Sequence, residues 1–312
     1  MHMPAPLESA ESRDPLPLPV RQSSLWAWIT PAMSIAVLAV VIWHFRTLDF
    51  RQLVSVVPSN PLFWLAFIAY YFVGTTNEFL IYKWLWGIPA EGFIALTRKN
   101  ISNGLLVDYL GEAYFYSWAR QKIKMDVSPF GAVKDVSILS ALVSNLTTLA
   151  LMVVAYPFAH TLISAHGNSV RALAASIGII ILVSTAILVF GKRIFSLDRK
   201  QLWGIAGMHF ASIVIGNGLQ ALCWNLALPD VPLSMWLLLA TAKMLLSRLP
   251  LISNKDVLLA AFAILVIGHD TELQVLLAFM ATLILAAHLF FGAILAVGDL
   301  VTIHPKYREV RE

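Results

Sequence analysis

The chain has 312 residues, of which 59% are hydrophobic and only 13% are charged, with a formal net charge of +4. A soluble globular domain carries about 25% charged residues, because it must cover its surface with polar groups. The composition therefore predicts an integral membrane protein and excludes a disordered protein and a nucleic-acid binder. The single cysteine, Cys223, excludes a disulfide scaffold.

Residues 1–24 are rich in proline and mixed in charge, and they precede the first apolar run at 26–43. No small-residue cleavage site follows this run, so we expect a retained helix and not a removed signal peptide. The sequence predicts a flexible cytoplasmic tail at 1–24, a polytopic membrane domain at 25–297 and a cytoplasmic C-terminal tail at 298–312.

A helix needs about 20 mostly apolar residues to cross the hydrocarbon core of a bilayer. Six runs meet this condition, at 26–43, 62–86, 136–158, 169–190, 203–227 and 272–296. Two further apolar stretches are interrupted by charge. The stretch 92–124 contains Arg98, Lys99, Asp108 and Glu112, and the stretch 233–268 contains Lys243, Arg248, Pro250, Lys255 and Asp256. We expect each of these two stretches to form a re-entrant helical hairpin.

Basic residues orient the spans, because Lys and Arg concentrate in cytoplasmic loops. The segment 87–135 contains six Lys or Arg residues and the segment 191–202 contains four. This distribution predicts a multi-pass inner-membrane protein with both termini in the cytoplasm. With six spans, the hairpin at 233–268 must then enter from the outer side and the hairpin at 92–124 from the cytoplasmic side. The predicted fold is all-α, with the units 62–158 and 203–296 forming an inverted repeat.

The two interrupted stretches share a pattern of Ser, a polar residue, a break and a later acid. The first runs from Ile101 to Glu112 and the second from Leu246 to Asp256. This arrangement resembles the flippase-like family that includes the transmembrane domain of lysylphosphatidylglycerol synthases. The matching positions are Asn103, Leu105, Leu106, Gly111 and Glu112 in the first motif, Leu249, Pro250 and Asp256 in the second, and Lys83 with Trp84, where the family tends to have Arg-Trp.

The sequence departs from the family pattern at both turns. Val107 and Asp108 replace a Pro-Gly turn, and Ser253 and Asn254 replace a glycine-rich turn. The resemblance implies a transporter built on the membrane half of such proteins. It does not imply an enzyme, since no aminoacyl-transferase domain follows the membrane domain in this sequence.

Charges near the bilayer centre cost about 2.5–3.5 kcal/mol each on insertion scales, so they usually mark a pathway or a buried partner. The substrate-binding candidates are Asn103, Glu112, Arg248 and Asp256. Arg248 is the candidate for a bidentate contact with a phosphate group. Secondary candidates are Glu78, Lys83, Lys243 and Lys255.

Two of these secondary candidates, Lys243 and Lys255, also fit a role at the membrane surface, because a lysine can extend its ammonium toward headgroup water. Glu78 lies within the predicted span 62–86. Its carboxylate either pairs with a buried base such as Lys243 or relays a proton, and the sequence favours neither.

An aromatic and then basic stretch follows Glu112 and consists of Tyr114, Tyr116, Trp118, Arg120, Lys122 and Lys124. Such a stretch is typical of a lipid-headgroup interface, with rings at headgroup depth and cations facing anionic lipids. A vestibule that collects anionic lipids would use the same residues. The histidines and the cysteine show no metal-ligand spacing, and no phosphate-binding glycine loop is present, so we expect no metal and no cofactor.

The sequence favours a bacterial inner-membrane lipid translocator that moves a phospholipid, a polyprenyl-linked amphiphile or a hopanoid-type amphiphile between leaflets. Its partners would be membrane lipids. Two alternatives remain open: an ion- or proton-coupled carrier of small solutes, and a membrane subunit that serves a separate lipid-modifying transferase enzyme.

Overall fold

The computed structural model describes residues 58–106, 109–123, 129–163, 167–231, 233–247 and 271–306, and it also places Ile35 and Ala39 in a helix. Every regular element in these ranges is an α-helix, and no strand occurs among them. The prediction of an all-α protein is therefore confirmed. The tail 1–24 and, apart from Ile35 and Ala39, the predicted span 26–43 lie outside the described residues.

Eight helices lie within the ranges that the structure describes. They are α3 (Pro61–Trp86), α4 (Glu91–Leu105), α5 (Leu110–Lys122), α6 (Phe130–Ile163), α7 (Gly167–Ile194), α8 (Arg199–Ala227), α9 (Leu233–Ser247) and α11 (Thr271–Lys306). The five long helices α3, α6, α7, α8 and α11 each contain one of the runs predicted to span the membrane.

Three stretches of the described chain are long and apolar enough to cross a membrane, namely Phe130–Val153, Arg199–Ala227 and Phe279–Gly298. The apolar stretch Gly178–Gly191 of α7 is shorter. Large apolar side chains on these helices point away from the protein interior, as at Leu182, which is 70% exposed. An apolar outer face of this kind is suited to lipid and not to water. The chain is therefore a helical protein of the membrane class.

The interrupted stretch 92–124 forms the two short helices α4 and α5, which pack against each other. They contain 15 and 13 residues, which at 1.5 Å per residue gives lengths of about 22 Å and about 20 Å. Neither helix reaches the roughly 30 Å that the hydrocarbon core requires. Tyr109, which precedes α5, has a φ angle of 69°, a left-handed conformation that is rare for an aromatic residue.

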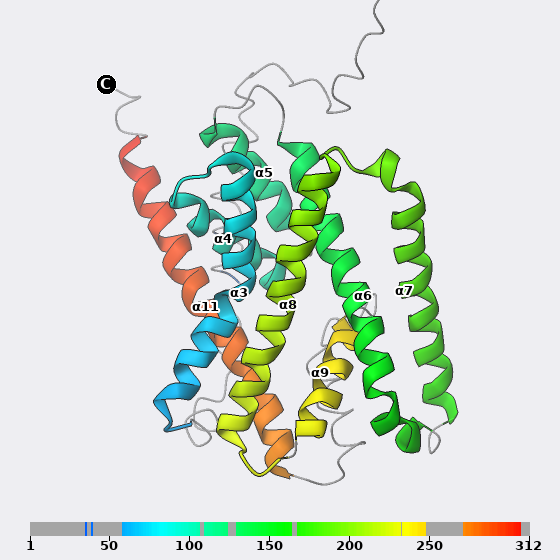
Figure 1. The fold of residues 1–312 in the computed structure, drawn as a ribbon. Coiled ribbons are helices and arrows are strands. Elements are labelled where there is room, and N and C mark those ends of the chain that lie inside the picture. Colours follow the sequence, from blue (N-terminus) through cyan, green and yellow to red (C-terminus); the bar gives the residue numbers. More distant parts are fainter. Residues whose placement is uncertain are drawn as a thin grey trace, which may run out of the picture.

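Figure 1 shows how the connections are distributed between the two ends of the helical bundle. The α4–α5 pair, the connection between α7 and α8 and the C-terminal end of α11 lie at one end. The connection between α8 and α9 and the first turn of α11 lie at the other end, and α9 lies in that half of the bundle. The short helices are thus found in opposite halves of the bundle.

The ends of several helices are specified by local sequence. The side chain of Asn60 accepts a hydrogen bond from the backbone amide of Leu62 at 2.9 Å and caps α3, which ends at Gly87 in the left-handed conformation. Asp198 caps α8 and exchanges hydrogen bonds with Gln201 in a capping box. The start of α8 lies beside the end of α3, since a Cβ at Gly204 would be 2.8 Å from the ring of Trp84.

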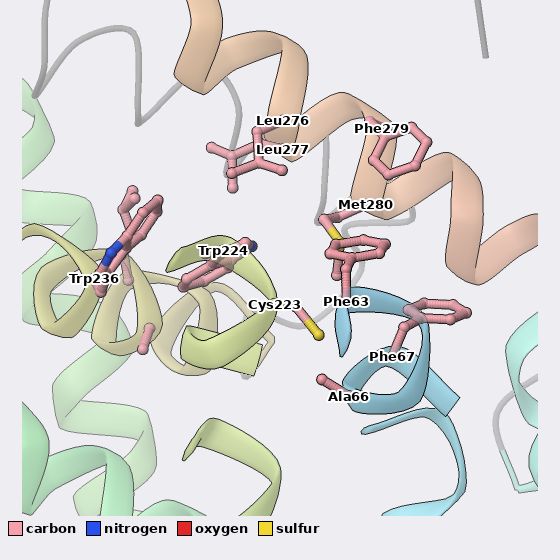
Figure 2. Packing of buried hydrophobic residues seen from close by; sticks show 13 residues of the cluster. Phe63, Ala66, Phe67, Cys223, Trp224, Trp236, Leu276, Leu277, Phe279 and Met280 are labelled. Atoms are coloured by element: carbon pink, nitrogen blue, oxygen red, sulfur yellow. The ribbon is translucent and has the colours of Figure 1, made fainter. Parts of the chain in front are cut away.

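Two apolar clusters hold the helices together. The first joins α3, α8, α9 and α11, and in it the rings of Trp224 and Trp236 stack with their centroids 5.5 Å apart (Figure 2). The second joins α3, α4, α5, α6 and α8 through Ile81, Tyr82, Leu96, Phe115, Val136 and Ile205, all fully or almost fully buried. This second cluster includes the helices that carry the candidate site.

Candidate functional site

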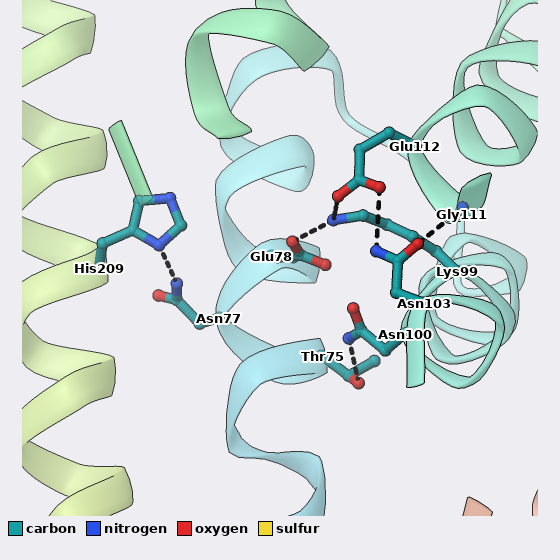
Figure 3. A network of polar contacts seen from close by, with 9 residues as sticks. All are labelled: Thr75, Asn77, Glu78, Lys99, Asn100, Asn103, Gly111, Glu112 and His209. Atoms are coloured by element: carbon teal, nitrogen blue, oxygen red, sulfur yellow. Dashed lines mark hydrogen bonds and ion pairs between the residues drawn. The ribbon is translucent and has the colours of Figure 1, made fainter. Parts of the chain in front are cut away.

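Lys99 of α4 lies at the centre of a buried ion network (Figure 3). Its side chain is only 4% exposed, and its ammonium contacts carboxylates from two other helices. It donates a short hydrogen bond to Glu78 Oε1 on α3, and its Nζ lies 3.3 Å from Glu112 Oε1 on α5. A single cation therefore joins the long helix α3 to both members of the short helix pair.

Asn103, one helical turn after Lys99, fixes the second carboxylate. Its Nδ2 donates to Glu112 Oε2 at 2.9 Å, and its Oδ1 accepts a hydrogen bond from the backbone amide of Gly111 at 2.8 Å. Both oxygens of the Glu112 carboxylate are thus engaged, one by Lys99 and the other by Asn103. The side-chain oxygen of Asn103 thereby provides an acceptor for the backbone N–H of Gly111, which lies in the first turn of α5 and has no acceptor within its own helix.

Gly111 has no room for a side chain. A Cβ atom at this position would lie 2.2 Å from the backbone oxygen of Lys99 and 2.7 Å from Asn103 Oδ1. The close approach of α5 to α4 therefore requires glycine here. This approach is what brings Glu112, the next residue, within reach of Lys99.

Further polar contacts continue the network along α3. Asn100 Nδ2 donates to Thr75 Oγ1 at 2.9 Å, and Asn77 Nδ2 lies 3.1 Å from Nδ1 of His209, a buried residue of α8 (Figure 3). The polar side chains of α3 thus connect α4 on one side to α8 on the other.

Arg98, next to Lys99, makes a separate set of contacts. Its guanidinium donates to the hydroxyl of Tyr114 at 2.7 Å and to the backbone oxygen of Leu295 at 3.4 Å. It therefore ties α4 to α5 and to α11.

The site contains two carboxylates, Glu78 and Glu112, against the single ammonium of Lys99, so the three ionised side chains sum to −1. Glu78 Oε2 and the hydroxyl of Tyr82 are both buried and lack a hydrogen-bond partner within the part of the chain that the structure describes. Glu78 lies eight residues before the end of α3, which is about 12 Å along the helix axis. Chemically, such a site can accept a proton or contact the polar group of a ligand.

A second polar cluster lies on α6. The side chain of Asp135, which is fully buried, accepts hydrogen bonds from the backbone amides of Ser196 at 2.6 Å and Leu197 at 2.8 Å. The neighbouring Lys134 donates to the backbone oxygen of Ile194 at 2.6 Å. These two residues hold the connection between α7 and α8 against α6, which is a structural task.

The structure brings three of the predicted site residues together, since Asn103, Glu112 and Glu78 all belong to the network. Lys83 is elsewhere: it is exposed, with its ammonium 5.7 Å from the centroid of the Phe79 ring. The other predicted residues Arg248, Lys255, Asp256 and Lys124 lie outside the described residues.

The buried base that contacts Glu78 is Lys99 and not Lys243, the example considered from the sequence. Lys243 of α9 is half-buried and donates to the hydroxyl of Tyr70 at 3.1 Å. The sequence could not distinguish these two lysines, because both lie in apolar stretches and only the packing of α3 decides which one Glu78 meets.

The predicted headgroup interface needs a correction at Tyr114. This residue is only 3% exposed and belongs to the second apolar cluster, because α5 turns this face toward the other helices. Trp118 is half-buried and stacks on Phe115 at 5.7 Å, and Tyr116 and Arg120 are also half-buried. Lys122 is exposed and lies 3.5 Å from the carboxylate of Glu91, so it is the described member of the set that faces outward.

Sequence reasoning did not select Lys99, the central residue of the site. Two signals point to it: it is a charge within an apolar stretch, and it precedes Asn103 by four residues, which places both side chains on one helix face. The described residues contain no group of three potential metal ligands, and Cys223 is a buried free thiol.

The fold and the site define a helical protein of the membrane class with an ion network buried among three helices. No protein-family model, curated protein or solved structure matches the chain.

Proposed function

We propose that the protein is a lipid translocator of the bacterial inner membrane, acting as a transporter and not as an enzyme. The observation that supports this proposal is the ion network of Lys99, Glu78, Glu112 and Asn103 inside a bundle with an apolar outer face. A lipid headgroup can cross the hydrocarbon region only where buried polar groups replace its water. The network offers donors and acceptors of this kind.

The chemistry of the network suits an amphiphile with a polar headgroup. Lys99 contacts two carboxylates, so a headgroup phosphate or hydroxyl can take the place of Glu112 while Glu78 remains in contact. The acyl chains would stay in the lipid, beside the exposed apolar faces of the long helices. The substrate class is a phospholipid, a polyprenyl-linked lipid or a hopanoid-type lipid.

The proposed topology has six spans, two re-entrant hairpins in an inverted repeat and both termini in the cytoplasm. It is supported by the shortness of α4 and α5 and by the position of α9 in the opposite half of the bundle (Figure 1). The clustering of Lys and Arg in 87–135 and 191–202 favours the cytoplasm for the end that carries α4 and α5.

A relationship to the flippase-like family is part of the same proposal. The motif residues Asn103, Gly111 and Glu112 are the ones that fix α5 against α4. If these residues form a family motif, the motif would contribute to transport by holding Glu112 in the buried network that contacts the headgroup.

An ion-coupled carrier of small solutes is the second candidate, because a buried site with two carboxylates and one ammonium also suits ion coupling. The two candidates differ in cargo. Leaflet exchange of a labelled lipid by the pure protein supports the translocator, whereas solute uptake without lipid exchange supports the carrier.

The test uses the full-length protein in unilamellar vesicles that contain a fluorescent phospholipid, with a membrane-impermeant reductant added outside. We expect the reductant to bleach both leaflets in vesicles with the parent protein and only the outer leaflet in empty vesicles. Lys99→Met and Glu112→Gln should abolish the exchange, and Glu112→Gln also keeps the size of the side chain.

Lys200→Met is the matched control, since Lys200 is an exposed lysine at the start of α8, outside the network. It should exchange lipid at the parental rate. All variants are first compared with the parent by gel filtration. Parental lipid exchange by both correctly folded network variants would refute the network as the lipid path.

A further inference from the structure

We propose that the buried network is a proton-binding site that takes up one proton on Glu78, and that this proton couples the translocation to the proton gradient. The coupling rests on the proposed function, whereas the proton binding does not. The argument starts from charge. Glu78 and Glu112 face one cation, Lys99, in a site where these side chains are between 4% and 19% exposed.

A net charge of −1 in such a place is costly, because the low-dielectric interior does not replace the hydration of an ion. One proton makes the three side chains neutral as a set. The proton comes from water and adds to a carboxylate oxygen, so no electron transfer and no other reactant is needed.

The hydrogen bonds determine where the proton can bind. Glu112 Oε1 lies 3.3 Å from Lys99 Nζ, and Glu112 Oε2 accepts from Asn103 at 2.9 Å. Glu78 Oε1 accepts from Lys99. The remaining carboxylate oxygen of the network, Glu78 Oε2, is buried and has no hydrogen-bond partner among the described residues. It is therefore the oxygen that is open to a proton.

Tyr82 provides an independent observation at the same place. Its side chain is fully buried, and its hydroxyl has no hydrogen-bond partner in the described part of the chain. Tyr82 follows Glu78 by four residues, which places both on one face of α3. Its ring packs on Phe115 with centroids 4.6 Å apart, so the hydroxyl is held in position. Two buried polar atoms without a partner among the described residues, Glu78 Oε2 and the Tyr82 hydroxyl, thus lie on the same helix beside Lys99 and Phe115.

The charged and titratable groups around Glu78 come from each helix packed on this part of α3. They are Lys99 from α4, Glu112 from α5, Tyr82 from α3 itself and His209 from α8, whose Nδ1 lies 3.1 Å from Asn77 Nδ2. On α6, Lys134 and Asp135 contact the connection between α7 and α8.

Proton uptake would change the contacts between helices in a defined way. A protonated Glu78 attracts Lys99 less strongly, so the contact between α3 and α4 weakens. The contact of Lys99 with Glu112 lies within the α4–α5 pair and gains strength. Protonation therefore loosens the short helix pair from α3 as one unit, and a movement of this pair would expose the site to the other side of the membrane.

Infrared difference spectroscopy of the full-length protein in lipid nanodiscs tests the binding without any transport. On acidification we expect the parent to gain the carbonyl band of one buried carboxylic acid. Glu78→Gln and Glu112→Gln should both lose this band, because Lys99 then balances the single remaining carboxylate. Lys99→Gln should gain twice the parental band. Glu91→Gln, which removes an exposed carboxylate, is the control and should keep the band.

Tyr82→Phe is a second variant that keeps the ring and removes only the hydroxyl. We expect it to retain the band at a shifted frequency, because the buried acid loses the dipole of a hydroxyl on the same face of α3. A parental band in Glu78→Gln, or no band in a folded parent, overturns the proton site. If the parent binds radioactive sodium and Glu78→Gln does not, the site binds a sodium ion and not a proton, and the proton site is also overturned.

The coupling is measured separately, as lipid exchange in vesicles with and without a pH gradient. A gradient should accelerate exchange by the parent and leave Glu78→Gln unaffected, and an equal rate in the parent with and without the gradient overturns the coupling. If the parent moves no lipid at all, the proposed function fails, while the infrared band still decides the proton site.

Discussion

The backbone amide of Gly111 and the side-chain oxygen of Asn103 are joined by a 2.8 Å hydrogen bond between α5 and α4. The bond exists because Gly111 lacks a Cβ and lets the two helices approach until the backbone oxygen of Lys99 fills the space a side chain would need. This one contact sets the geometry of the site, since it places Glu112 beside Lys99.

Replacing Gly111 by alanine should therefore destabilise the protein. The added methyl group forces α5 away from α4, and overpacking of this kind costs about 1–3 kcal/mol in the free energy of unfolding. Gly74→Ala is the matched control, because a Cβ at Gly74 meets no atom within 4 Å and lies inside α3. Alanine there should be neutral or stabilising by up to about 1 kcal/mol. Thermal unfolding in detergent checks this, and equal melting temperatures for the two variants would contradict the steric argument.

Removing only the cation of the network should destabilise the protein more than removing all three charges of the network. Lys99→Met leaves Glu78 and Glu112 buried without a counter-ion, and breaking a buried ion pair from one side costs about 3–5 kcal/mol. A triple variant that adds Glu78→Gln and Glu112→Gln has no charge left in the network, so it should recover most of the loss. The melting temperatures of the parent and the two variants measure the effect. A triple variant less stable than Lys99→Met would show that the charges are not what makes Lys99 important for stability.

The connection between α7 and α8 should depend on Asp135. In Asp135→Leu the backbone amides of Ser196 and Leu197 lose their acceptor, at a cost of about 0.5–1.5 kcal/mol for each hydrogen bond removed. Hydrogen–deuterium exchange should accelerate at these two amides. Asp135→Asn retains an acceptor oxygen and should fall between the parent and the leucine variant. Asp198→Asn preserves a good N-cap and should leave the exchange of Ser196 and Leu197 unchanged. Exchange at the parental rate in Asp135→Leu would show that Asp135 does not hold the connection between α7 and α8.

Labelling of single cysteines checks the topology. Cys223 is buried, so a Cys223→Ala background removes the native thiol without exposing a new surface. Lys200→Cys, at the basic end of the bundle, should react with a charged maleimide only after the inner membrane is made permeable. Asp230→Cys, at the other end, should react in intact spheroplasts. Labelling of both positions from the same side is incompatible with the proposed topology.

The long helices were predictable because each contains an apolar run of about 20 residues, which is typical of a helix in a membrane protein. The runs 62–86 and 203–227 lie inside α3 and α8 with ends only a few residues apart. The break between α4 and α5 was also readable, since charges interrupt the apolar stretch there. The motif reasoning named Asn103 and Glu112 as site candidates, and the structure joins them by a hydrogen bond between α4 and α5.

The same reasoning failed where a contact depends on neighbouring helices. Tyr114 resembles an interfacial aromatic residue in the sequence, yet α5 turns it into the core, where its hydroxyl accepts a hydrogen bond from Arg98. Asp135 had no distinguishing feature in the sequence, because its partners are backbone amides about 60 residues later, at Ser196 and Leu197.

The sequence by itself determined the membrane class, the all-helical fold and the position of the long helices. These follow from apolar length and composition, which are local properties of the chain. The tertiary structure decided that Lys99 and not Lys243 meets Glu78, and that one carboxylate oxygen of the network has no partner among the residues that the structure describes. Such contacts depend on the rotation and register of helices that are distant in the sequence, and a few degrees or one residue of slip would give each charge a different neighbour.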